Sequence, residues 1–117
     1  MEKITTFEDV FNKIIDSFKG QRVEIHTRQE GISLARLSTR VDRITINPAE
    51  DFSEKKKIGL ISLQRKVNNH FETAVNIPFI LGFDTMQAYF TNQGSLIKTL
   101  NLEFKIRKTA ERKKRLA

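Results

Sequence analysis

Near the start of the chain, apolar residues recur at the spacing of one helical face, namely Phe7, Val10, Phe11, Ile14, Ile15 and Phe18. Steps of three and four residues put these side chains on one side of an α-helix. Thr5 with Glu8, and Thr6 with Asp9, both have the spacing of a capping box, and Gly20 suits the left-handed position that ends many helices. The pattern predicts an amphipathic helix over residues 6–19, with three phenylalanines that a sheet or a second helix must cover.

The pattern then changes to the period of two that is typical of strands, over residues 21–47. Residues 21–28 alternate strictly between apolar and polar positions. A turn is expected at 29–31, because it ends in a glycine, which tolerates positive φ. The apolar phase slips on both sides of residues 38–40, and such a slip requires a bulge, a bend or a turn. We therefore expect a three-stranded antiparallel meander, or one hairpin whose second strand is strongly bent.

Residues 58–77 fit two different structures. Six apolar residues share one helical face, namely Leu60, Leu63, Val67, Phe71, Ala74 and Val75. The same stretch also fits two strands joined by an Asn68–Asn69 turn, because residues 71–77 alternate with a period of two. Two adjacent asparagines are poor residues for a helix interior, so the hairpin is favoured and the helix stays open as the alternative.

A further strand pair is predicted near the end of the chain, over residues 86–90 and 100–107. Both stretches alternate, and Asn92–Gln93–Gly94 between them is typical of a turn. Because Tyr89 and Phe90 are neighbours in a strand, one of the two rings must face outward. The polar stretch 48–57 is expected to form an exposed loop or one helical turn.

Together these elements predict an α+β fold, with the N-terminal amphipathic helix packed on a curved, mainly antiparallel β-sheet or a small barrel. The 117 residues are enough for a single domain, which we place at residues 1–108 and follow with a basic tail at 109–117. No apolar run reaches the ~18–20 residues of a membrane span, and no cysteine is present for disulfides or thiolate metal sites. We expect a cytoplasmic protein without a membrane partner.

Positive charge gathers in two parts of the chain. The net charge is +7, from 21 basic and 14 acidic residues, and the stretch from Lys105 to Ala117 holds seven of the bases and one acid. The 21–47 region holds five arginines. Lysine and arginine bind phosphates and release counterions, so both parts favour a polyanionic partner. The candidate nucleic-acid-binding residues are Arg28, Arg36, Arg40, Arg43, Arg107, Lys108, Arg112, Lys113, Lys114 and Arg115.

The arginine-rich region lacks one component of a base-binding surface. Residues 19–51 contain no aromatic residue, whereas platforms that bind unpaired bases place aromatic rings among their lysines and arginines. We therefore expect this surface to contact the phosphate backbone only.

The chain lacks the common catalytic and nucleotide-binding motifs. His26 and His70 are far apart and, without cysteine, do not form a zinc-binding pattern. Asp84, Glu103 and Lys105 resemble the three conserved positions of the PD-(D/E)xK nucleases, in which two carboxylates hold Mg²⁺ and a lysine orients water. No proline precedes Asp84, and a charged tail follows where that family has a helix and a strand. We expect a protein without enzymatic activity, bound metal or cofactor. Glu103 and Lys105 are expected to form ion pairs on the surface.

Two functions fit this chain from different classes. The first is a small non-enzymatic nucleic-acid-binding accessory protein that contacts the phosphate backbone through its basic tail and an arginine-rich strand face. The alternative is a protein-interaction module, a small regulator or inhibitor that docks on an acidic protein surface. In either case an unpaired sheet edge leaves room for a homodimer.

Overall fold

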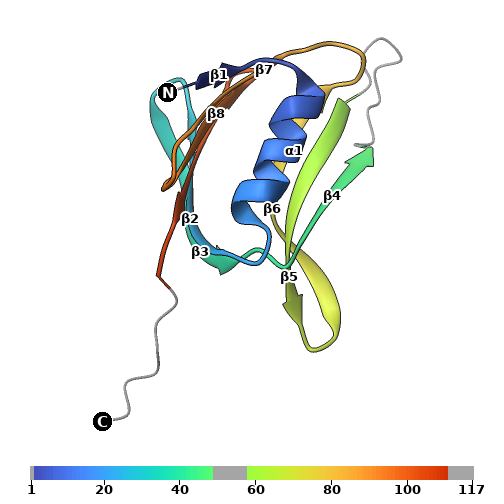
Figure 1. Cartoon of the computed structure of the whole chain (residues 1–117), viewed down its shortest axis with the longest axis vertical. Helices are drawn as coiled ribbons and strands as arrows, with labels where there is room; N and C mark the ends of the chain where they lie inside the picture. Colours follow the sequence, from blue (N-terminus) through green and yellow to red (C-terminus); the bar gives the residue numbers. More distant parts are fainter. Residues whose placement is uncertain (1, 49–57, 111–117) are drawn as a thin grey trace.

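Two antiparallel sheets and one helix make up the part of the chain that the structure, a computed structural model, describes, which is residues 2–48 and 58–110 (Figure 1). The six-stranded sheet has the order β1-β7-β8-β9-β2-β3, and the three-stranded sheet has the order β4-β5-β6. In chain order the elements are β1 (Glu2–Ile4), α1 (Phe7–Phe18), β2 (Arg22–Gln29), β3 (Ile32–Arg40), β4 (Arg43–Pro48), β5 (Ile58–Val67), β6 (His70–Ile80), β7 (Met86–Phe90), β8 (Gly94–Thr99) and β9 (Leu102–Lys108).

The helix α1 lies between the two sheets, as Figure 1 shows, and the prediction of a helix in this part of the chain is confirmed. Its buried side chains Val10, Ile14 and Phe18 have no exposed surface. The ring of Phe7 stacks on that of Phe79 from β6, with 4.2 Å between their centroids. The helix therefore joins both sheets to one core.

The two ends of α1 are held differently. Gly20, directly after the last turn, has a φ of +79°, as the sequence predicts. At the other end Thr6 donates to the carboxylate of Asp9 at 2.7 Å but caps no backbone group. The backbone N–H of Phe7 instead donates to Asp84, at 2.9 Å, so a carboxylate distant in sequence replaces the expected local cap.

The prediction of a three-stranded meander over residues 21–47 is wrong for the third strand, which belongs to the other sheet. β2 and β3 form a hairpin whose register shifts beside Thr27, but β4 pairs with β5 in the other sheet. The chain crosses between sheets at Val41, which is fully buried, and at Asp42, whose N–H donates to the carbonyl of Gln64 at 2.8 Å. The chain changes sheets there, and the sheets do not close, so the option of a small barrel is also wrong. The coarser prediction of an α+β fold with a helix on an antiparallel sheet is confirmed.

The hairpin alternative for residues 58–77 is correct. β5 and β6 pair along their whole length around a two-residue turn. Asn68 and Asn69 have φ angles of +49° and +66°, and asparagine tolerates this left-handed region better than most residues. The expected loop after Pro48 falls on residues 49–57, which lie outside the described residues.

The expected final hairpin is in fact three strands. β8 separates β7 from β9, and the turn between β8 and β9 places Leu100, predicted to lie in a strand, at a φ of +55°. A side chain at Gly94 would collide with the carbonyl oxygen of Ile106, so glycine allows β8 to approach β9 closely. β1, which pairs with β7 at one edge of the sheet, was not predicted.

Candidate nucleic-acid interface

The face of the six-stranded sheet opposite α1 carries most of the charged side chains of that sheet. Residues paired across neighbouring antiparallel strands point to the same side, so the register defines rows across this face. The central row runs through all six strands as Lys3, Tyr89, Leu96, Lys105, His26 and Arg36.

Two further rows flank the central one. One consists of Gln87, Lys98, Glu103, Arg28 and Ser33. The other consists of Gly94, Arg107, Glu24 and Ser38. The three rows together hold six bases and two acids, and we call this surface the cationic face, with the bases Lys3, Arg28, Arg36, Lys98, Lys105 and Arg107.

The two acids only partly offset the positive charge of the cationic face. Glu24 accepts an ion-paired hydrogen bond from Arg107 at 3.2 Å. Glu103 is the register partner of both Lys98 and Arg28. Because surface ion pairs are weak, these contacts leave the bases available to a ligand with more negative charge.

The pKa of His26 is sensitive to the charges on the cationic face. Its Nε2 lies 2.8 Å from the hydroxyl oxygen of Ser33. Its pKa lies below the usual value because the ring is partly desolvated and because Arg36, Arg28 and Lys105 repel its charged form, while Glu24 acts in the opposite direction. Basic side chains from three strands, β2, β3 and β9, are therefore close enough to lower the pKa of the same histidine.

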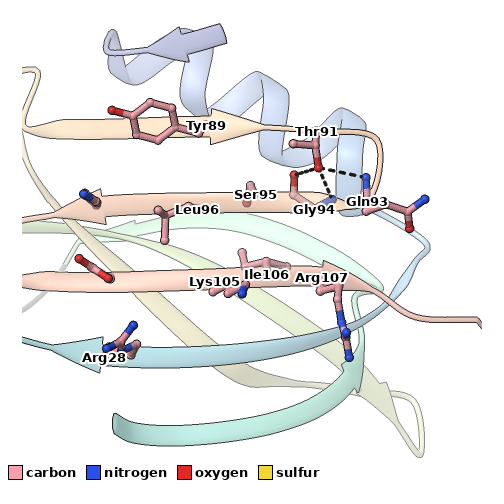
Figure 2. A pocket seen from close by; sticks show the side chains of 12 residues that line it. Arg28, Tyr89, Thr91, Gln93, Gly94, Ser95, Leu96, Lys105, Ile106 and Arg107 are labelled. Carbon is pink, nitrogen blue, oxygen red and sulfur yellow. Dashed lines mark hydrogen bonds between the residues drawn. The ribbon is translucent and has the colours of Figure 1, made fainter. Parts of the chain in front are cut away.

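An open hollow of about 620 Å³ lies in the cationic face. Figure 2 shows Tyr89, Leu96 and Lys105 side by side on β7, β8 and β9. Tyr89 and Leu96 are half-buried, and the hollow is also lined by four other charged residues, which are Arg28, Lys98, Glu103 and Arg107.

One end of the hollow is fixed by the turn between β7 and β8. The hydroxyl oxygen of Thr91 accepts hydrogen bonds from the N–H groups of Gln93 and Gly94, at 3.2 and 3.3 Å (Figure 2). These bonds hold the turn from within, and the carbonyl of Gln93 also accepts a hydrogen bond from the N–H of Lys108 on β9 at 2.7 Å.

The structure brings together some of the predicted binding residues. Arg28, Arg36 and Arg107 lie on the cationic face. Arg40 lies at the end of β3 on the same sheet, where its Nε contacts Asp42 at 2.9 Å. These four residues come from three adjacent strands.

Other predicted residues lie elsewhere. Arg43 belongs to the other sheet, where its guanidinium lies 3.8 Å from the ring centroid of Phe71. Lys108 pairs with the buried Val23, so its side chain leaves the sheet on the side of α1. Arg112, Lys113, Lys114 and Arg115 lie outside the described residues.

Lys3, Lys98 and Tyr89 also belong to this surface, although the sequence did not single them out as binding residues. Lys105 was counted in the basic 105–117 stretch and as a nuclease-like or ion-pairing residue, but not among the candidate binding residues. The strict alternation of residues 102–108 already placed Lys105 on a polar face. Placing Tyr89 beside it requires knowing that β8 lies between β7 and β9.

The nuclease-like residues do not form one site. Asp84 binds the N-terminus of α1 and lines a hollow there with Phe7 and Phe83. Glu103 and Lys105 line the hollow of the cationic face, which shares no residue with the first. No group of three or more histidines and carboxylates suited to a metal ion occurs among residues 2–48 and 58–110.

Comparisons with known proteins identify no relative: no family model, no curated protein and no solved structure matches this chain. Within its described residues, the protein has no helix with the length and apolar character needed to cross a membrane.

Proposed function

We propose that the protein is a small non-enzymatic nucleic-acid-binding accessory protein. It holds the phosphate backbone on the cationic face, and the basic tail at residues 109–117 adds further contacts. The observation that carries this proposal is the register, which gathers six bases and two acids in three adjacent rows on one side of a single sheet. Clustered lysines and arginines are the electrostatic footprint of polyanion binding.

The arrangement supports binding and offers no support for catalysis. Neutralising a phosphate needs a base in reach, which several strands supply here. Cleaving the backbone by the metal-assisted route would need two carboxylates near one ion. Asp84 is instead occupied with the backbone N–H of Phe7.

The proposal is tested by titrating labelled duplex DNA, single-stranded DNA and RNA against the full chain at several salt concentrations. A second chain ends after Ala110, which keeps the bond from the N–H of Thr109 to the carbonyl of Arg22 and removes four tail bases. For duplex DNA we expect the slope of log affinity against log salt to fall by about 3.6 on truncation. Weaker but persistent binding locates the rest of the site on the cationic face, and no binding of the full chain at low salt refutes the proposal.

A protein-interaction module is the second candidate, and one observation favours it. Ile32 and Leu34 lie on β3, an edge strand, and keep 66% and 52% of their surface exposed. Exposed apolar residues beside an unpaired strand edge suit pairing with another chain, including a second copy. Sedimentation of the wild-type chain and of Leu34→Lys tests this: a dimer lost in the variant supports edge pairing, and a monomer in both excludes the second copy as the partner.

A further inference from the structure

The hollow of the cationic face contains an aromatic ring that the arginine-rich strands themselves lack. Tyr89 comes from β7, and its register partner Leu96 comes from β8. Both lie in the same cross-strand row as Lys105, His26 and Arg36. Between Lys3 at one end of the row and Lys105, the row therefore holds an aromatic and an apolar side chain, and beyond them it is basic.

The dimensions of this row match a short piece of nucleic acid. Neighbouring strands are about 4.8 Å apart, so the four steps from Tyr89 to Arg36 span roughly 19 Å. A stacked strand advances about 3.4 Å per nucleotide, so the row covers at most about five nucleotides.

The position of the Tyr89 ring favours contact with unpaired bases over contact with the paired bases of a duplex. Tyr89 is half-buried on β7, the second strand of the six-stranded sheet, between Lys3 on β1 and Leu96 on β8. Bases of a duplex are stacked on one another, and reading them requires an element that enters a groove. A ring set into a sheet surface meets the face of a base only if that base is unstacked.

We propose that the cationic face binds single-stranded nucleic acid, with one base stacked on Tyr89 in the hollow and the following phosphates bound by Lys105 and Arg36. This inference rests on the proposed function and names its substrate class. It replaces the expectation of backbone contact alone, which followed from the lack of aromatic residues in 19–51. An acidic protein partner would use the same bases without needing the ring.

The composition of the chain supplies a specific probe. Tyr89 is the one tyrosine among the 117 residues, and the chain has no tryptophan. Intrinsic tyrosine fluorescence of the unmodified protein therefore reports on Tyr89 alone. Three oligonucleotides of about twelve units are compared at equal ionic strength: oligothymidine, an abasic deoxyribose-phosphate strand and a duplex.

We expect oligothymidine to quench the tyrosine emission, and the abasic strand to bind without quenching it. Labelled-strand anisotropy should show that Tyr89→Ala weakens oligothymidine binding roughly 5- to 150-fold, the range measured for loss of one base–aromatic stack. The same variant should bind the abasic strand as the wild type does. Tyr89→Phe, which keeps the ring, should retain the affinity.

A matched control uses an aromatic residue on the other sheet. Phe71 is 39% exposed and lies under Arg43 on the three-stranded sheet, so Phe71→Ala should leave oligothymidine binding unchanged. Equal binding of all three probes without quenching overturns the stacking inference and leaves the proposed function intact. Failure of all three to bind at low salt overturns both. The quenching measurement needs no variant, so it decides the matter even if Tyr89→Ala does not fold.

Discussion

Removing two bases from the cationic face gives the most direct test of its electrostatics. Arg36 and Lys105 flank His26 in the central row, and both side chains are exposed. No hydrogen bond or ion pair of either side chain occurs within the described residues. The double variant Arg36→Gln and Lys105→Gln should therefore fold as the wild type does, with a change in unfolding free energy below about 0.5 kcal/mol.

The expected size of the effect follows from counterion release. Each phosphate contact contributes about 0.7 to the slope of log affinity against log salt for a single strand. Losing two contacts lowers the slope by about 1.4, so the ratio of affinities at about 50 mM and about 200 mM salt shrinks by roughly sevenfold. Duplex DNA would show a somewhat larger change because its charge density is higher.

The assay is a salt series with labelled oligothymidine, and it needs a control of equal net charge. Lys13 on α1 and Lys66 on β5 are exposed and lie outside the cationic face. Lys13→Gln with Lys66→Gln makes the same change in net charge and should leave the slope nearly unaltered. If both double variants lower the slope equally, the protein binds through its overall charge, and the site assignment is wrong.

The same double variant offers a measurement without any ligand. Arg36 and Lys105 both lower the pKa of His26, so their loss should raise that pKa toward its ordinary value. A histidine titration followed by NMR measures this directly. An unchanged pKa would show that the three side chains do not share one field, whatever the binding data say.

Three further variants test the fold and the histidine. Gly59→Ala places a methyl group against the ring of Phe79 and should lower the unfolding free energy by about 1–3 kcal/mol in a denaturant titration. Asp84→Ala removes the acceptor for the N–H of Phe7 and should lower the unfolding free energy by about 0.5–2 kcal/mol, while leaving oligonucleotide binding unaffected. Because the pKa of His26 is lowered in the folded state, the unfolded state takes up a proton first as the pH falls below about 6.5. Stability should therefore fall over that window, and less steeply in His26→Gln, as thermal melts at a series of pH values would show.

The predictable parts of the fold were those encoded in short-range patterns. The helical face of α1 and the paired asparagines at 68 and 69 each carry a local signal strong enough to identify an element. β8 carries no such signal, because its outward position 96 is leucine and its inward positions 95 and 99 are serine and threonine. Only Ile97, which is buried, and Lys98, which faces outward, follow the expected alternation, and two residues are too few to identify a strand.

Only the part of the candidate site formed by residues close together in the sequence could be predicted. Arg28 and Arg36 lie close together in the sequence, and the alternation of the β2–β3 hairpin places both on the same face of the sheet. Lys105 and Tyr89 join them only through the strand order, in which β9 lies beside β2 and β8 lies between β9 and β7. Arg43 was misplaced for the opposite reason: it is near the other arginines in sequence, but the chain changes sheets at Asp42.

The strand order also has a consequence for how the chain folds as it is made. β9 follows every other described strand along the chain, yet it lies in the interior of its sheet, between β8 and β2. Until β9 is synthesised, the β2–β3 hairpin has two open edges and cannot join β7 and β8. The pairing of β9 with β2 closes a loop of about 80 residues. Long-range contacts of this kind slow folding. A nascent chain stopped before Leu102 would therefore expose unpaired strands, and premature termination there should yield an aggregation-prone fragment in place of a shorter folded protein.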